Sequence, residues 1–230
     1  MPSNGRGRTV EVTVADFFIY LANKNYSSWS LRAWLALKQT RVAFKEEVIP
    51  LDQPTTREEI LRHAPSGKVP ALRHGEIMIW ESLAIGEYLA ELVPDARLWP
   101  ESRAARAHAR AISAEMHAGF MAMRQSMPMN MRTSLAGRRI SAEVQDDINR
   151  ITAIWRTCRE RHGEGGDFLF GSFGMADAMF APVASRFTTY KVPLDEVAES
   201  YRQAILRHPP FQEWQAAAKN EPWIIPKYEL

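Results

Sequence analysis

Strand-forming runs in this sequence all lie before residue 94, and the rest of the chain carries only the spacing of helices. The runs are rich in β-branched and aromatic residues and fall at 17–21, 44–49, 66–72 and 77–80. A helical pattern separates the first two runs, and another follows the last one. The order is strand, helix, strand, then two strands joined by a turn and a final helix. It predicts an α/β domain whose first two strands are parallel.

Two prolines, Pro94 and Pro100, mark the change to a purely helical pattern. Beyond them the sequence predicts helices at about 102–127, 141–162 and 174–190, and two shorter ones before the end. We therefore expect an α/β plus all-α chain. Its predicted parts are a flexible N-terminal extension at 1–15, an α/β domain at 16–93, a linker at 94–101 and an all-helical domain at 102–230.

Composition narrows the function classes. The chain has 230 residues, 46% hydrophobic and 24% charged, as in soluble globular proteins. Its net charge of +2, without basic residues interleaved with aromatics, argues against a nucleic-acid partner. Apolar runs near the start are far shorter than the roughly 20 residues that cross a membrane, so we expect no membrane partner. The single cysteine, Cys158, excludes an intrachain disulfide and a cysteine-cluster metal site, and a cytoplasmic protein without a bound metal is expected.

Two serines, Ser27 and Ser28, stand between the first strand and the helix that follows it. Serine is a preferred N-cap, and the free N–H groups of a helix start favour negative charge by roughly 0.3–1 kcal/mol at exposed sites. From the residues alone, the serines are either caps or part of a site for an anion.

Four short motifs together resemble those of the cytosolic glutathione transferases. They are Ser27–Ser28, Val69–Pro70, Glu81–Ser82 and Gly174-Met175-Ala176-Asp177. Each motif alone is weak, but the four in this order at these spacings are specific. The first motif is similar to that of the serine-type members, which include the zeta-like enzymes and bacterial relatives. The resemblance implies an N-terminal thioredoxin-like βαβ-ββα domain followed by a C-terminal helical bundle.

The resemblance also implies that glutathione is the co-substrate and that Ser27 activates its thiol. Ser28 and Tyr20 are alternative sources of the activating hydroxyl. The implied glutathione contacts are Ser28, Lys68, Val69, Pro70, Glu81 and Ser82. Val69 would pair with the cysteinyl backbone of glutathione, Ser82 would hold its γ-glutamyl carboxylate and Glu81 its ammonium.

A methionine-rich stretch, Met116 to Met131, belongs to the helix that flanks the electrophile cleft in this family. Flexible thioethers suit varied apolar partners, although methionines at helical spacing are also typical of a core. The candidate electrophile contacts are Met116, His117, Phe120, Met123 and Arg124, and Asn130 is a further polar candidate. Asp177 is expected to be structural, as half of a capping box in which Gly174 takes the place of Ser or Thr.

We therefore expect a homodimeric glutathione transferase that conjugates glutathione to a small hydrophobic electrophile. One alternative is a zeta-like glutathione-dependent isomerase, and another is a non-catalytic binding or scaffold protein of the same family. Thiol–disulfide exchange is disfavoured, because Trp29 stands where the zeta pattern has a cysteine.

Overall fold

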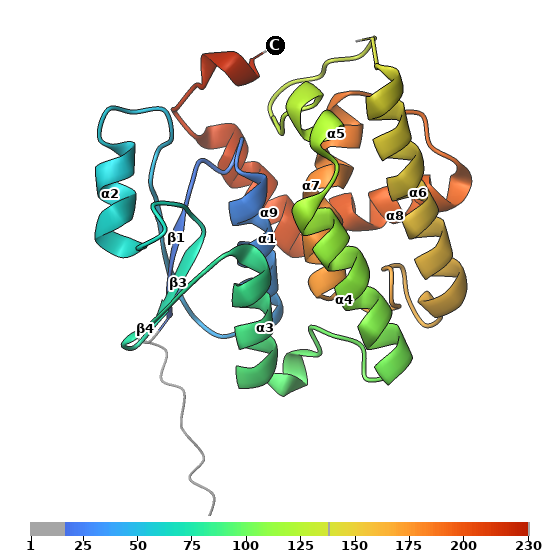
Figure 1. Cartoon of the computed structure of the whole chain (residues 1–230), viewed down its shortest axis with the longest axis horizontal. Coiled ribbons are helices and arrows are strands. Elements are labelled where there is room, and N and C mark those ends of the chain that lie inside the picture. Colours follow the sequence, from blue (N-terminus) through green and yellow to red (C-terminus); the bar gives the residue numbers. More distant parts are fainter. Residues whose placement is uncertain (1–16, 138, 230) are drawn as a thin grey trace, which may run out of the picture.

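The computed structural model describes residues 17–137 and 139–229, and the predicted flexible extension at 1–15 lies outside them. Figure 1 shows a small sheet with its helices beside a bundle of helices. The first part contains β1 (Phe17–Leu21), α1 (Ser28–Gln39), β2 (Lys45–Val48), α2 (Thr56–His63), β3 (Ala71–His74), β4 (Ile77–Trp80) and α3 (Ser82–Leu92). The second contains α4 (Arg103–Ala118), α5 (Met121–Ser126), α6 (Ala142–His162), α7 (Met175–Thr189), α8 (Glu196–Arg207) and α9 (Pro209–Asn220). Short 3-10 turns, η1 (Pro94–Ala96) and η2 (Pro226–Tyr228), lie between the parts and near the end.

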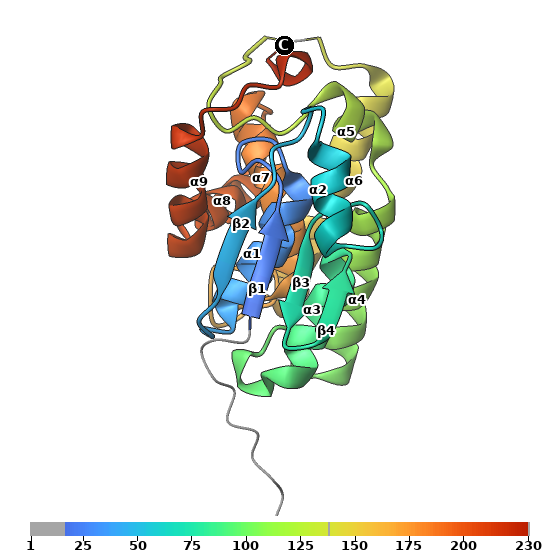
Figure 2. The ribbon, with the colours of Figure 1, turned by 90° about the vertical axis from the view of Figure 1, so that its left-hand side faces the viewer.

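The four strands form one sheet in the order β2-β1-β3-β4, seen broadside in Figure 2. β1 and β2 are parallel, with Ile19 opposite Glu46, which confirms the predicted βαβ unit. β3 runs antiparallel to both β1 and β4. It begins only at Ala71, later than the predicted 66–72, because the preceding Pro70 has no N–H to give to the ladder.

Helix α1 is the centre of the molecule. It packs against α3 in the first part and against α7 and α9 in the second. Trp34 of α1 meets Trp214 of α9 edge to face, with ring centroids 5.3 Å apart. A helix covered on several sides must be apolar nearly all round, which explains the unbroken apolar run in its sequence.

The opposite face of the sheet is covered by α2 (Figure 1). A small apolar cluster joins the sheet, the chain after β2 and α2; its members are Tyr20, Ile49, Ile60, Ala64 and Ala71. The Tyr20 ring stacks on His63 at a centroid distance of 4.1 Å.

The predicted single helix at 102–127 is wrong, because the chain breaks between α4 and α5. Phe120 lies at φ +64°, in the left-handed region, so α5 starts in a new direction after Gly119. Arg124 secures the break by donating from Nε to the Gly119 carbonyl at 2.9 Å and from Nη2 to the Met116 carbonyl.

Helix α7 forms the buried axis of the helical part, and Asp177 fixes its start. One carboxylate oxygen of Asp177 accepts from the backbone N–H of Leu169 at 3.0 Å and from the Tyr201 hydroxyl at 3.1 Å. The other accepts from the N–H of Gly174 at 2.9 Å. Burial raises the pKa of Asp177 to about 6, against the effect of these hydrogen bonds. Asp177 therefore has the structural role expected from the sequence.

Candidate functional site

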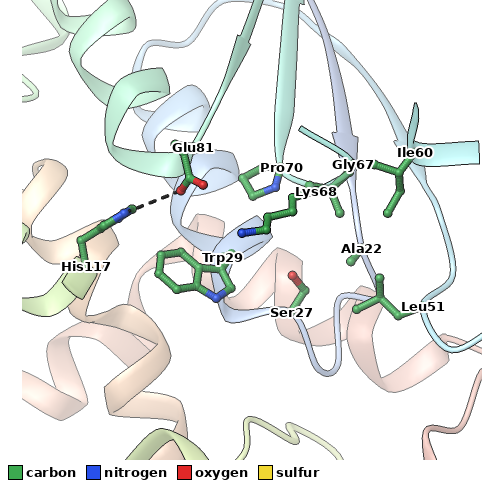
Figure 3. Close-up of a pocket in the computed structure, with 11 residues that line it drawn as sticks. Ala22, Ser27, Trp29, Leu51, Ile60, Gly67, Lys68, Pro70, Glu81 and His117 are labelled. Atoms are coloured by element: carbon green, nitrogen blue, oxygen red, sulfur yellow. Dashed lines mark ion pairs between the residues drawn. The ribbon is translucent and has the colours of Figure 1, made fainter. Parts of the chain in front are cut away.

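A cleft of about 490 Å³ opens at the end of β1, beside the starts of α1, β3 and α3 and the last turn of α4 (Figure 3). Its volume lies in the range of small-molecule sites. The cleft is lined by Ala22, Ser27, Trp29, Leu51, Ile60, Gly67, Lys68, Val69, Pro70, Glu81 and His117. Three of the four motifs singled out in the sequence thus meet at one place, although they are spread along the chain from Ser27 to Ser82.

Ser27 is the N-cap of α1. Its backbone is extended, and its Oγ accepts from the backbone N–H of Ser30 at 3.2 Å. The same Oγ lies 2.9 Å from the hydroxyl oxygen of Ser30. Ser27 is therefore both a cap and a lining residue of the cleft, so the two roles proposed for it from sequence do not exclude each other.

The loop before Ser27 is held by the end of the chain. The Glu221 carboxylate accepts from the backbone N–H groups of Lys24 at 2.5 Å and Asn25 at 2.9 Å. Trp214 donates from its indole nitrogen to the Lys24 carbonyl at 2.9 Å. Sequence reasoning missed these residues, because no local pattern links positions almost 200 apart in the chain.

The next wall of the cleft comes from the segment that enters β3. The Val69–Pro70 peptide bond is cis, and both residues line the cleft. Lys68 is exposed, and Figure 3 shows its side chain reaching into the same space as those of Trp29 and Ser27. Gly67, at φ +63°, makes the turn that leads into this segment.

Glu81 and Ser82 form the start of α3. Glu81 lines the cleft and has φ +70°. This backbone conformation costs of order 1–3 kcal/mol for a non-glycine residue. Ser82 is 1% exposed, and its Oγ has no hydrogen-bond partner among the described residues. An unpaired buried hydroxyl at a helix start, next to a cleft, is suited to a ligand with a carboxylate.

Trp29 and His117 form the wall on the side of the helical part. Their rings meet edge to face at 5.0 Å, and His117 Nε2 lies 3.6 Å from a carboxylate oxygen of Glu81. Burial lowers the pKa of His117; Glu81 opposes this shift, and Arg32 and Arg124 add to it. A neutral imidazole at this wall can accept or donate a hydrogen bond to a bound molecule.

Positive charge lies behind Trp29. The guanidinium carbon of Arg32 is 4.5 Å from the Trp29 ring centroid, and that of Arg124 is 5.2 Å from it. Arg32 is fully buried, and its two terminal nitrogens have no hydrogen-bond partner in the described parts of the chain. Burial lowers its pKa, with Arg124 and Arg186 adding to the effect. Wherever these groups are protonated, they favour an anion in the cleft.

Of the five electrophile candidates on α4, on α5 and in the break between them, only His117 lines the cleft. Met116 and Met123 are completely buried in the hydrophobic core, and Phe120 is 8% exposed. Arg124 donates to the carbonyls at the end of α4, and Asn130 is buried, with its Oδ1 accepting from Asn25 Nδ2 at 3.0 Å. Most of the methionine stretch is core packing in this structure: Met116, Met123, Met127, Met129 and Met131 are buried, and Met121 is exposed.

The two alternative hydroxyls are placed less well than Ser27. Tyr20 points to the α2 side of the sheet, where it stacks on His63. Ser28 is buried and is absent from the described residues that line the cleft. Residues 17–137 and 139–229 contain no group of three or more His, Cys, Asp or Glu side chains placed to hold a metal ion. No helix within the same ranges is long and apolar enough to cross a membrane.

Known proteins are similar in sequence to the part of the chain that carries the cleft motifs. The family model of the glutathione S-transferase N-terminal domain matches residues 26–92. A probable maleylacetoacetate isomerase from Caenorhabditis elegans is 35% identical over 173 residues, which cover 74% of this chain and 79% of that protein. The maleylacetoacetate isomerase of Rattus norvegicus is 27% identical over 183 residues, covering 76% of this chain and 80% of the relative.

Solved structures agree in fold. A glutathione transferase homologue from Burkholderia, crystallised with bound glutathione, superposes with a TM-score of 0.69 at 20% identity. The match covers 90% of this chain and all of that one. An omega-class glutathione transferase from Trametes versicolor, in complex with 2,4-dihydroxybenzophenone, gives a TM-score of 0.67 over 87% of this chain and 93% of its own. The thioredoxin-like domain and helical bundle are thus the shared architecture.

Proposed function

The chain belongs to the glutathione S-transferase family, and from that premise we propose that the Ser27 hydroxyl donates a hydrogen bond to the glutathione sulfur, so that the thiol loses its proton to solvent more readily and the thiolate attacks a hydrophobic electrophile. Glutathione is the co-substrate of this family, and the chain is a glutathione-dependent enzyme. The observation that carries the proposal is the position of Ser27, an N-cap hydroxyl on the wall of a cleft shared with Val69, Pro70 and Glu81.

The chemical task is to hold a thiolate at neutral pH. A free thiol with a pKa near ~8.5 is only a few per cent ionised at pH 7, and the thiolate is the nucleophile. A hydroxyl donor beside the positive end of α1 stabilises the anion, and each unit by which the pKa falls corresponds to ~1.4 kcal/mol. The arginines behind Trp29 act in the same direction.

The remaining wall residues, with the buried Ser82 that directly follows the wall residue Glu81, fit the two ends of glutathione. In the proposed complex, the backbone of Val69 pairs with the cysteinyl unit, as an added strand would. The unpaired Ser82 hydroxyl and the start of α3 hold the γ-glutamyl carboxylate, while Glu81 pairs with the adjacent ammonium. Lys68 is placed to meet a carboxylate, and the electrophile would lie against Trp29 and His117.

Isomerisation is the second candidate, and the identity to maleylacetoacetate isomerases over three quarters of the chain favours it. An isomerisation changes only the arrangement of atoms within the substrate, so glutathione is recovered unchanged. Thiol–disulfide exchange has no support, since the only cysteine of the chain, Cys158, is fully buried, and burial raises its pKa to about 12.

The assay that separates these reactions follows glutathione itself. The wild-type protein is incubated with a panel of aryl and alkyl halides and, separately, with maleylacetoacetate. Conjugation consumes glutathione stoichiometrically with product, whereas isomerisation converts substrate at constant glutathione. If calorimetry detects no glutathione binding to the wild type, both candidates fail and a scaffold role replaces them.

A single variant, Ser27→Ala, tests the role of the serine. If Ser27 donates to the thiolate, the pKa of bound glutathione should rise toward ~8.5, and turnover should fall by about 10–1000-fold with little change in affinity. If Ser27 were only a cap, the loss would appear as ~0.5–2 kcal/mol of folding stability with near-normal turnover. Ultraviolet difference absorbance of the thiolate against pH, run beside denaturant melts, distinguishes the two outcomes.

A further inference from the structure

The hydroxyl of Ser30 stands directly behind that of Ser27. Ser30 lies in the first turn of α1 and is completely buried. Its Oγ accepts from the backbone N–H of Ala22 at 2.9 Å, at the end of β1. The same oxygen lies 2.9 Å from Ser27 Oγ, and the Ser30 N–H donates to Ser27 Oγ at 3.2 Å. Ser27 and Ser30 therefore share two contacts, while only Ser27 lines the cleft.

The proton between the two hydroxyls can belong to either residue, because hydroxyl groups rotate to suit their surroundings. If Ser27 donates, the proton of Ser30 must point elsewhere, and none of the described residues offers it another acceptor, since the second partner of Ser30 Oγ, the Ala22 N–H, is itself a donor. A buried donor left unpaired is unfavourable. If Ser30 donates, its own donor is satisfied, and the Ser27 proton is free to point into the cleft.

We infer that Ser30 is a positioning residue that donates to Ser27 Oγ and so directs the Ser27 proton toward the glutathione sulfur. The Ala22 N–H supports this arrangement, since it occupies the Ser30 oxygen as an acceptor and leaves the Ser30 proton for Ser27. Ser27 Oγ then accepts two hydrogen bonds, and an oxygen that accepts becomes a stronger donor through its own proton. The inference rests on the proposed function of Ser27 as the donor to the thiolate.

A double-mutant cycle tests the inference. The pKa of enzyme-bound glutathione is measured by ultraviolet difference absorbance in the wild type, Ser27→Ala, Ser30→Ala and the double variant. We expect Ser30→Ala to raise that pKa by about 0.5 to 1, the worth of one net hydrogen bond, with glutathione affinity nearly unchanged. In the Ser27→Ala background the same change should have no effect, because no hydroxyl remains to be directed.

The outcomes separate the two claims. If Ser27→Ala raises the thiolate pKa but Ser30→Ala does not, or if Ser30→Ala acts equally in both backgrounds, the positioning role is overturned and the role of Ser27 stands. If the wild type shows no depressed thiolate pKa, the proposed function fails first.

Two further variants guard against a folding effect. Ser113→Ala removes another completely buried serine hydroxyl, on α4, at a residue that does not line the cleft, and should leave the thiolate pKa unchanged. Ser30→Cys is close in size to serine and keeps a weaker donor. If Ser30→Ala does not fold, the pH profile of kcat/KM for Ser30→Cys should move in the same direction by a smaller amount. An unchanged profile overturns the inference.

Discussion

Ser82 is deeply buried and its hydroxyl is unpaired, so its effect on glutathione binding can be measured separately from its effect on the folding stability of the protein. Because Ser82 Oγ bonds to no described residue, removing it should cost the free protein less than about 0.5 kcal/mol. If the hydroxyl holds the γ-glutamyl carboxylate, Ser82→Ala should weaken glutathione binding by roughly 1–2 kcal/mol. Calorimetry with matched denaturant melts checks both numbers. Equal affinities in Ser82→Ala and the wild type would contradict the assignment.

His208 is a residue whose effect appears in the pH dependence of stability. Its ring stacks on Phe173 at a centroid distance of 4.1 Å, and its Nε2 has no hydrogen-bond partner in the described residues. Burial lowers its pKa from 6.5 to about 4. The unfolded chain therefore binds a proton that the folded chain rejects between these values. The contribution of His208 is fully present above pH 6.5 and is lost as the pH falls toward 4.

His208→Phe should remove this acid sensitivity, because phenylalanine keeps the stack on Phe173 and has no nitrogen to protonate. We expect the denaturant midpoint of the variant to fall less steeply than that of the wild type from pH 6.5 to 4. Comparing the two proteins at each pH cancels the carboxylates that titrate in the same window, including Asp177. Parallel curves for the two proteins would show that His208 does not contribute.

At the scale of elements, what could be predicted depended on whether the deciding interaction was local. The start of α1 could be predicted because Ser27 is a local N-cap signal. The order of strands and helices could be predicted from the spacing of apolar residues, and the continuous apolar run of α1 matches its packing against helices of both parts. The break after α4 falls at Gly119, its C-cap, but a lone glycine inside a helical pattern is a weak stop signal, and nothing in the sequence indicated that Phe120 would adopt φ +64°. For the same reason the sequence could suggest Met116 and Met123 as contacts but could not show that they face the core.

The C-terminal tail is an element that only the structure reveals. Residues 221–229 pass over the loop that leads to Ser27, and the backbone N–H of Ile225 in this tail donates to the Tyr26 hydroxyl of the loop at 3.3 Å. Arg132, from the helical part, donates to the same hydroxyl at 2.8 Å. Glu221 pairs with two backbone N–H groups of that loop. A loop held by donors and acceptors so distant in sequence depends on the tail for its position.

Glu221→Ala should loosen this loop, since it leaves the N–H groups of Lys24 and Asn25 without their carboxylate partner. We expect a loss of about 1–3 kcal/mol in stability and faster hydrogen exchange at these two amides. Lys227→Ala is the matched control in the same tail, because its ion pair with Asp52 is exposed and worth little. Unchanged exchange at both amides in Glu221→Ala would show that the tail does not hold the loop.

At the scale of the whole molecule, the outer edge of the sheet, formed by β4, is an exposed surface that a partner could cover. Among the strands that the structure describes, β4 pairs only with β3, and two large apolar side chains on it, Ile77 and Trp80, are 51% and 42% exposed. Natural proteins usually blunt or cover such edges, and an exposed apolar patch marks a site of interaction. Family resemblance implies a two-fold pair in which the N-terminal part of one chain contacts the helical part of the other.

We therefore predict a homodimer at micromolar concentration that depends on β4. Ile77→Glu should shift the mass measured by light scattering toward the monomer. Burying the unpaired glutamate charge in a subunit contact is unfavourable, and the charge remains in water if the subunits separate. Val197→Glu places the same charge on α8 at a residue that is 42% exposed, and it should leave the dimer intact. A monomeric wild type would contradict the dimer itself. A dimer that persists in Ile77→Glu would instead show that the subunits meet on a surface away from β4.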